Sequence, residues 1–110
     1  MSWLGKEMIV ESLRELASRQ LQEARWLSDG SSDISSFTEA VEQLFTDSGL
    51  GDSLQKRETG FSHSVEDELR ELDAMLSKID SDRAPNEIIA DPKMGPIREK
   101  SGRILEIMRS

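Results

Sequence analysis

The chain has 110 residues, of which 35% are hydrophobic and 33% are charged, and its formal net charge is −8. This length suits one compact domain and is too short for two. The absence of cysteine excludes disulfides, thiolate metal sites and cysteine nucleophiles, and the negative charge disfavours nucleic-acid binding, which depends on neutralising phosphates.

The first predicted element is a long helix over about residues 5–27. Its hydrophobic residues recur every three or four positions and form an arc of about 120°, which suits packing against two neighbouring helices. The residues of this arc are Ile9, Val10, Leu13, Leu16, Ala17, Leu21, Ala24 and Leu27. Because so wide an arc can exceed what three shorter helices cover, self-association into a homodimer is an open alternative.

Trp26 lies beside this arc rather than within it. Two interpretations fit this position: the indole covers the edge of the core, or it stays exposed and anchors a partner protein. The second has a physical basis, because tryptophan is enriched among the residues that dominate binding energy at interfaces. Trp26 is therefore a candidate partner-binding residue.

A short helix is predicted over residues 37–47, after a polar loop, SDGSSD, at 28–33. Ser36 and Glu39, three residues apart, form the capping-box pattern of a helix start. The apolar face of this helix consists of Phe37, Ala40, Val41, Leu44 and Phe45. Gly49 follows it and can adopt the left-handed conformation with which many helices end.

Residues 49–61 predict a flexible connection with at most one helical turn near Leu54, because they are polar and poorly patterned. The lone G-x-G of Gly49 and Gly51 has no strand before it, which indicates a turn rather than a phosphate-binding loop. Leu50 and Phe61 are, with Trp26, the candidates for an exposed apolar patch that binds a partner.

The next predicted helix spans residues 64–79 and carries the most regular pattern in the chain. Its apolar seam, at spacings of four, three, four and three, consists of Val65, Leu69, Leu72, Leu76 and Ile79. Ser62 and Ser64 are both candidate N-caps. The acidic residues 66–68 follow in the first turn, where negative charge stabilises the positive end of the helix dipole. Glu66 precedes Arg70 by four residues, which predicts a surface ion pair.

His63, the only histidine, stands between two serines at this helix start. A catalytic triad needs a histidine in hydrogen-bond geometry with its nucleophile and with a third orienting group, which adjacency in sequence does not supply. The nucleophile-elbow motif G-x-S-x-G does not occur in the chain. We therefore interpret His63 as a helix-start residue and predict no catalytic residue.

Metal and cofactor sites are not predicted. One histidine without cysteine cannot complete the usual zinc shell. The acidic stretches that begin at Asp29 and Asp80 do not fit a calcium loop, because Ile34 and Pro85 stand where that loop needs glycine. A di-metal carboxylate bundle would need Glu-x-x-His pairs, which the sequence lacks.

The last third of the chain predicts a short helical turn at 85–90, with Pro85 at its first position, and a final helix at 96–109. The final helix is expected to start at Pro96, because proline has no amide proton and clashes with a preceding helical turn. Its inner face holds Ile97, Ile104, Leu105 and Met108. Gly102 lies in the interior of this helix, where glycine lowers helix stability by about 1 kcal/mol relative to alanine. Close approach of another helix would explain a glycine at this position.

Charge is unevenly distributed along the chain. Residues 1–90 carry −10 and residues 91–110 carry +2, and no lysine or arginine occurs between Arg25 and Lys56. We expect the basic final helix to dock on the acidic remainder; a basic patch for an anionic partner is the alternative.

The sequence predicts a cytoplasmic protein that does not bind membranes. The start, MSWLGKEM, lacks the apolar run of a signal peptide. No stretch approaches the roughly 18 apolar residues of a membrane span. The polar faces of the predicted helices carry mainly Glu and Asp, which anionic membranes repel.

These patterns predict an all-α, single-domain bundle over residues 1–110 with four main helices, at about 5–27, 37–47, 64–79 and 96–109. We expect a non-enzymatic protein-interaction, regulatory or assembly module that uses amphipathic helix faces. The alternatives are an acidic inhibitor or decoy of a basic protein, and a small helical enzyme with a site of arginine and acidic side chains. The expected partner is another protein or a second copy of this chain.

Overall fold

The computed structural model describes residues 5–27, 36–56 and 59–109, and their regular structure is entirely helical. The elements are α1 (Lys6–Ala17), α2 (Arg19–Trp26), α3 (Phe37–Glu42), the π-helical turn η1 (Gln43–Asp47), α4 (Leu50–Lys56), α5 (His63–Leu76), α6 (Pro85–Ala90) and α7 (Met94–Arg109). The predicted all-α class is confirmed. The described residues form seven α-helices and one π-helical turn rather than four main helices.

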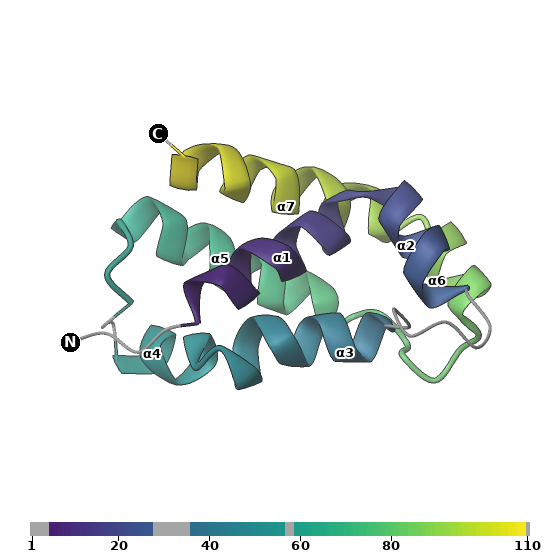
Figure 1. Cartoon of the computed structure of the whole chain (residues 1–110), viewed down its shortest axis with the longest axis horizontal. Helices are drawn as coiled ribbons and strands as arrows, with labels where there is room; N and C mark the ends of the chain where they lie inside the picture. Colours follow the sequence, from purple (N-terminus) through teal and green to yellow (C-terminus); the bar gives the residue numbers. More distant parts are fainter. Residues whose placement is uncertain (1–4, 28–35, 57–58, 110) are drawn as a thin grey trace.

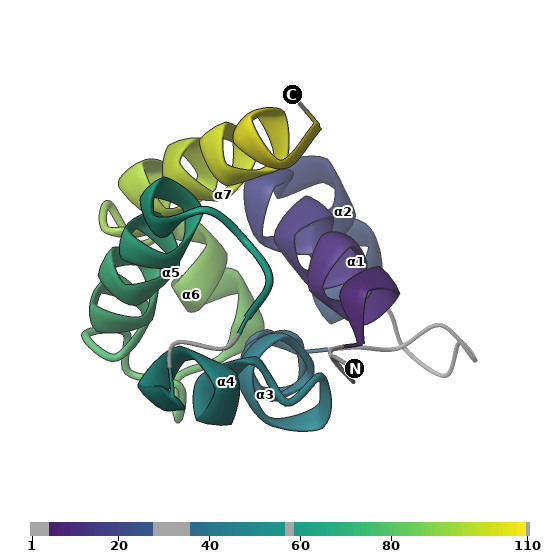
Figure 2. The same cartoon turned by 90° about the vertical axis from the view of Figure 1, so that its left-hand side faces the viewer.

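The helices surround one hydrophobic core. Seen end-on in Figure 2, α7 lies at the top, α1 and α2 at the right, α3 and α4 at the bottom, and α5 and α6 at the left. Helix α1 packs against α7, η1 and α3, and α5 packs against α7. The fully buried hydrophobic side chains at the centre are Ile9, Leu13, Leu16, Leu44, Leu50, Leu69, Leu72, Met94, Ile97 and Ile104.

The predicted continuous helix over 5–27 is wrong at Ser18, where the chain is extended, with φ −119° and ψ 113°. The Ser18 hydroxyl accepts a hydrogen bond from the Leu21 amide at 3.1 Å, so Ser18 caps the start of α2. The carbonyls of Glu15 and Leu16 at the end of α1 each accept a hydrogen bond from the Gln22 side-chain amide, at 3.1 and 2.9 Å. These hydrogen bonds supply partners to backbone N–H and C=O groups that would otherwise be unpaired at the two helix ends.

The helix predicted over 37–47 is confirmed, as the α-helix α3 followed by η1. The Ser36 hydroxyl accepts from the Glu39 amide at 3.1 Å, as the capping pattern predicts. Gly49 has φ 81°, the left-handed conformation predicted for a helix end. The π-helical turn closes with Ser48, whose hydroxyl donates to the Leu44 carbonyl.

Part of the connection predicted at 49–61 is a helix, α4, instead of at most one turn near Leu54. Leu50 is fully buried and Leu54 is 6% exposed, so both apolar residues of this segment join the core. Residues 57 and 58 lie outside the described residues, as does the loop predicted at 28–33. These two leucines are sufficient to order the helix, because α4 packs against η1.

Helix α5 starts one residue before the predicted 64 and ends at Leu76, three residues before the predicted 79, so Ile79 of the apolar seam lies in the turn beyond the helix. All five seam residues are at most 7% exposed, and the Ser62 hydroxyl caps the helix by accepting from the Val65 amide at 3.3 Å. The predicted surface pair of Glu66 with Arg70 is wrong: Glu66 is buried and accepts a hydrogen bond from the Thr59 hydroxyl at 2.6 Å. Arg70 instead pairs with Asp67 at 3.4 Å.

The C-terminal elements differ from prediction only at their edges. Helix α6 has Pro85 in its first turn as predicted. Helix α7 begins at Met94, two residues before the predicted start. Pro96 then falls in the first turn, where the amide that it lacks would have no partner within the helix. An idealised Cβ on Gly102 would lie 4.0 Å from the Ala17 Cβ, an ordinary contact distance, so close approach of α1 does not explain the glycine.

Candidate functional site

The three candidate partner-binding residues do not form an exposed patch. Trp26 is 5% exposed and Leu50 is fully buried, while Phe61 is half-buried against the core. The Trp26 ring meets the Phe37 ring edge-on, with centroids 6.0 Å apart. Trp26 therefore covers the edge of the core, and the interpretation of Trp26 and Leu50 as exposed anchors is wrong.

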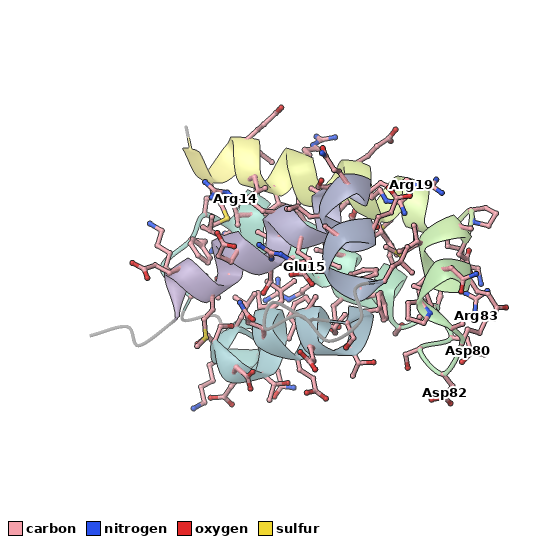
Figure 3. The ribbon with its side chains drawn as sticks, turned by 45° about the vertical axis from the view of Figure 1, so that its right-hand side comes forward. Arg14, Glu15, Arg19, Asp80, Asp82 and Arg83 are labelled. Atoms are coloured by element: carbon pink, nitrogen blue, oxygen red, sulfur yellow. The ribbon has the colours of Figure 1, made fainter. Side chains whose placement is uncertain are left out.

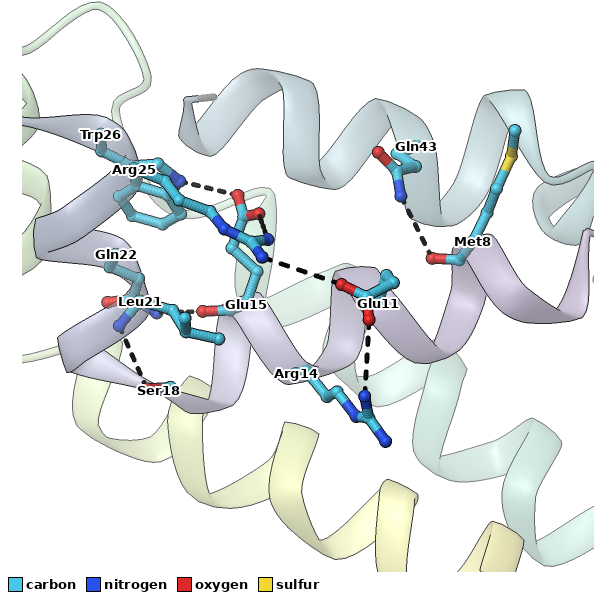
Figure 4. A network of polar contacts seen from close by, with 10 residues as sticks. All are labelled: Met8, Glu11, Arg14, Glu15, Ser18, Leu21, Gln22, Arg25, Trp26 and Gln43. Atoms are coloured by element: carbon cyan, nitrogen blue, oxygen red, sulfur yellow. Dashed lines mark hydrogen bonds and ion pairs between the residues drawn. The ribbon is translucent and has the colours of Figure 1, made fainter. Parts of the chain in front are cut away.

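A polar network fixes α2 against α1 (Figure 4). The Glu15 carboxylate, 5% exposed, accepts from the Trp26 indole N–H at 2.8 Å and from the Arg25 guanidinium at 2.7 Å. Exposed Glu11 lies further out, 3.8 Å from Arg25 and 3.4 Å from Arg14. Because each buried group has a partner within this network, we assign it a structural role.

A second network joins α2, α6 and α7. The Gln22 side-chain oxygen accepts from Arg98 Nε at 3.0 Å, and the other end of the Arg98 guanidinium donates to the Ile89 carbonyl at 2.6 Å. Burial lowers the pKa of Arg98, and the nearby positive charge of Arg19 lowers it further. The arginine is therefore fixed by neutral acceptors at a helix junction.

The predicted docking of the basic final helix is visible in ion pairs between α7 and α5. Lys100 Nζ lies 2.9 Å from Glu68 and 2.6 Å from Glu71. The hydrogen bonds to Glu71 and Glu68 raise the pKa of Lys100, and the hydrogen bond from Lys100 lowers the pKa of Glu71. These contacts hold the two helices together.

We predict that Lys100→Met makes stability less dependent on pH in the acid range. The Glu71 pKa is lowered by folding, so its contribution to stability is complete above its ordinary value of 4.5 and is lost as the pH falls below it. Without Lys100 the Glu71 pKa returns towards 4.5 and this loss becomes smaller. Urea unfolding from about pH 6 to about pH 3 measures the effect.

Lys56→Met is the matched control for this measurement. Lys56 pairs with Asp52 at 3.1 Å, but both side chains are more than 60% exposed, so the pair contributes little. If Lys100→Met and the unmodified protein lose stability in parallel as the pH falls, the assigned role of Lys100 is wrong.

A groove of about 350 Å³ lies between α3 and the C-terminal part of α5. We call it the α3/α5 groove, and its lining residues are Phe37, Thr38, Val41, Glu42, Asp73, Leu76, Ser77, Ile79 and Ser81. Its apolar members belong to or pack against the core, and its polar members are exposed. The arrangement is an apolar floor with a polar rim, which is typical of sites that take an apolar side chain.

The charges around the α3/α5 groove are predominantly negative. Neither Glu42 nor Asp73 forms an ion pair within the described residues. Asp80 and Asp82 lie just beyond α5, on the loop that leads to α6 (Figure 3). Arg83 on the same loop is engaged by the Asp91 carboxylate, so it does not neutralise the rim.

The basic residue Lys78 lies in the turn that follows α5 and does not line the groove. It lines a separate pocket of about 140 Å³ between α5 and α7, with Met75, Lys93 and Pro96. The ammonium group of Lys93 lies 3.4 Å from the Lys78 carbonyl, close to the end of α5. The acidic and the basic side chains therefore line two different pockets.

His63 is the first residue of α5 and is exposed, at the opposite end of that helix from the groove. Its place agrees with the predicted helix-start role. Within the described ranges, no group of three or more His, Cys, Asp or Glu side chains is placed to hold a metal ion. None of the described helices combines the length and the apolar character needed to cross a bilayer.

Comparison with protein-family models, curated proteins and solved structures finds no match for this chain.

Proposed function

We propose that this protein is a non-enzymatic interaction module that binds another protein through the α3/α5 groove. The observation that supports the proposal most directly is an apolar groove of about 350 Å³ whose rim carries Glu42 and Asp73. Interface residues that dominate binding energy insert into pockets of this kind, while the polar rim fixes orientation. A regulatory or assembly subunit would use such a surface.

The placement of the buried carboxylates and of the buried Gln22 amide supports a binding role rather than a catalytic one. Glu15, Gln22 and Glu66 are each hydrogen-bonded to other parts of the fold, and none of them lines the groove. Catalytic acids and bases are usually placed in a concave site that perturbs their pKa. Here the concave surface holds exposed carboxylates, hydroxyls and apolar side chains, which suit recognition.

Ser77→Trp is expected to abolish partner binding while leaving the fold intact. Ser77 is exposed on the groove rim, so an indole there would fill the groove without displacing core residues. Capture from native lysate would identify the partner by mass spectrometry, and titration of the purified partner would then measure affinity. We expect a loss of at least about tenfold, which corresponds to about 1.4 kcal/mol of binding energy.

Ser64→Trp is the matched control, because Ser64 is also exposed on α5 but lies in its first turn. This variant should bind the partner as the unmodified protein does. Equal binding by all three proteins would contradict the groove as the site, and failure of the unmodified protein to capture any partner would contradict the proposed function.

A second candidate function is an acidic inhibitor of a basic protein. The observation that favours it is the gathering of Glu39, Glu42 and Asp73 near one groove without ion pairs in the described parts of the chain. Binding of this kind weakens as salt screens the charges. A partner whose affinity is the same at about 0.05 M and about 0.5 M salt would contradict this alternative.

Self-association stays a prediction, but its original basis is weaker in this structure. Ile9, Leu13 and Leu16 of the wide apolar arc are fully buried by other helices of the same chain. Met8 and Leu27 are the large hydrophobic residues of the described chain that remain well exposed, at 44% and 45%. Light scattering distinguishes a monomer from a dimer, and cell fractionation tests the predicted cytoplasmic location.

A further inference from the structure

We infer that the occupant of the α3/α5 groove is a segment of another protein that inserts one large apolar side chain and carries Lys or Arg on both sides of it. This inference rests on the proposed function and adds the chemistry of the partner. It follows from the size of the groove, from the origin of its two walls and from the sign of the charge on each wall.

The size and the lining of the groove suit one large apolar side chain. Its volume of about 350 Å³ is near the lower end of the roughly 300–1,000 Å³ found for small-molecule sites. Phe37 and Val41 from α3, with Leu76 and Ile79 from the α5 side, supply the apolar lining. An aromatic or large aliphatic side chain is the complement of such a lining, because it gains most from leaving water.

The two walls of the groove each contribute a carboxylate. Glu42 belongs to the α3 wall, and Asp73 belongs to the α5 wall. Glu39 extends the acidic character one turn along α3, and Asp80 extends it beyond the end of α5. A bound segment that crosses the groove therefore meets negative charge on both sides of its apolar anchor, which favours basic residues at both flanks.

The same charges argue against other occupants. Phosphate groups of nucleic acids and anionic lipids would be repelled by this rim. A second copy of the chain carries a net charge of −8, so its approach to this acidic rim is unfavourable, and its Arg98 and Lys100 are already engaged within its own fold. Charge complementarity thus selects a basic segment of a different protein.

A displayed library of random 12-residue peptides tests the inference. Peptides are selected on the immobilised full chain after depletion on Ser77→Trp, so that the enriched sequences are those that need an open groove. We expect enrichment of one aromatic or large aliphatic residue with Lys or Arg on both sides. A synthetic peptide of the enriched sequence is then titrated by fluorescence anisotropy.

The double variant Glu42→Gln with Asp73→Asn should weaken this peptide about tenfold, since each exposed ion pair contributes a factor of roughly two to five. The matched control is Glu7→Gln with Glu87→Gln, which changes the net charge equally at two exposed acids outside the groove. The control variant should bind the peptide within about twofold of the affinity of the unmodified protein, because its altered charges lie outside the groove and are screened by salt.

The possible results separate the inference from the proposed function. Enriched peptides without an excess of Lys or Arg, or an affinity unaffected by the double variant, overturn the basic-segment inference and leave the groove as a protein-binding site. Absence of any peptide that depends on an open groove overturns both. A dimer in light scattering that Ser77→Trp dissociates would identify a second copy as the occupant and overturn the inference.

Discussion

Replacing Glu15 with alanine is expected to lower the free energy of unfolding by about 3 kcal/mol, as measured by urea denaturation. The Glu15 carboxylate is buried and accepts hydrogen bonds from the Trp26 indole and the Arg25 guanidinium. The substitution leaves the indole N–H buried without this acceptor and removes the charge that compensates a half-buried arginine. Both losses act at the junction of α1 and α2.

Glu11→Ala is the control for this prediction. Glu11 belongs to the same network, but its side chain is 48% exposed, so water replaces its partners and the change should stay within about 0.5 kcal/mol. If the two variants unfold at the same urea concentration, burial of Glu15 does not determine the stability of the junction.

Leu69→Ala is expected to lower the free energy of unfolding by about 3 kcal/mol, because truncation of a buried leucine removes apolar contacts and leaves a cavity. Leu69 is fully buried at the middle of the α5 seam, where α5 packs against α7. For a domain whose total stability is about 5–15 kcal/mol, this is a large fraction.

Leu27→Ala makes the same chemical change at a side chain that is 45% exposed. It should cost less than about 1 kcal/mol, because much of that side chain is already in contact with water. Thermal and urea unfolding of both variants measure the difference. Equal losses would mean that Leu69 is not at the centre of the core.

The sequence was most informative where a pattern and a cap agree. In α5, the apolar seam and the hydroxyl of Ser62 specify the same helix, and both appear in the structure. Ser36 before α3 and Pro85 at the start of α6 were predictable for the same reason. Each of these signals acts within a few residues, so no knowledge of tertiary contacts is needed.

The break at Ser18 was not predicted, although the contacts that stabilise it join residues at most seven positions apart. The apolar period continues through Ser18, and only the reach of the Gln22 amide to the end of α1 shows how the break is satisfied. The burial of Glu66 was missed for a similar reason. Its partner, Thr59, comes from a segment whose course the local pattern did not indicate.

The α3/α5 groove shows what helical periodicity in a sequence can and cannot predict. Phe37, Val41, Leu76 and Ile79 are correctly predicted as inward-facing, but periodicity does not tell how completely neighbouring helices close over them. The groove exists because residues far apart in sequence, on α3 and α5, meet without filling the space between them. Such a gap follows from side-chain shapes in three dimensions.

The contact between α1 and α7 has a consequence for synthesis on the ribosome. Helix α1 is synthesised before α7, yet α7 is a principal neighbour of its apolar face. At about 5–20 residues per second, the stretch between Ala17 and Met94 takes roughly four to fifteen seconds to translate. During that interval the apolar face of α1 lacks one of its main neighbours, and shielding by a chaperone would keep it from binding to other chains.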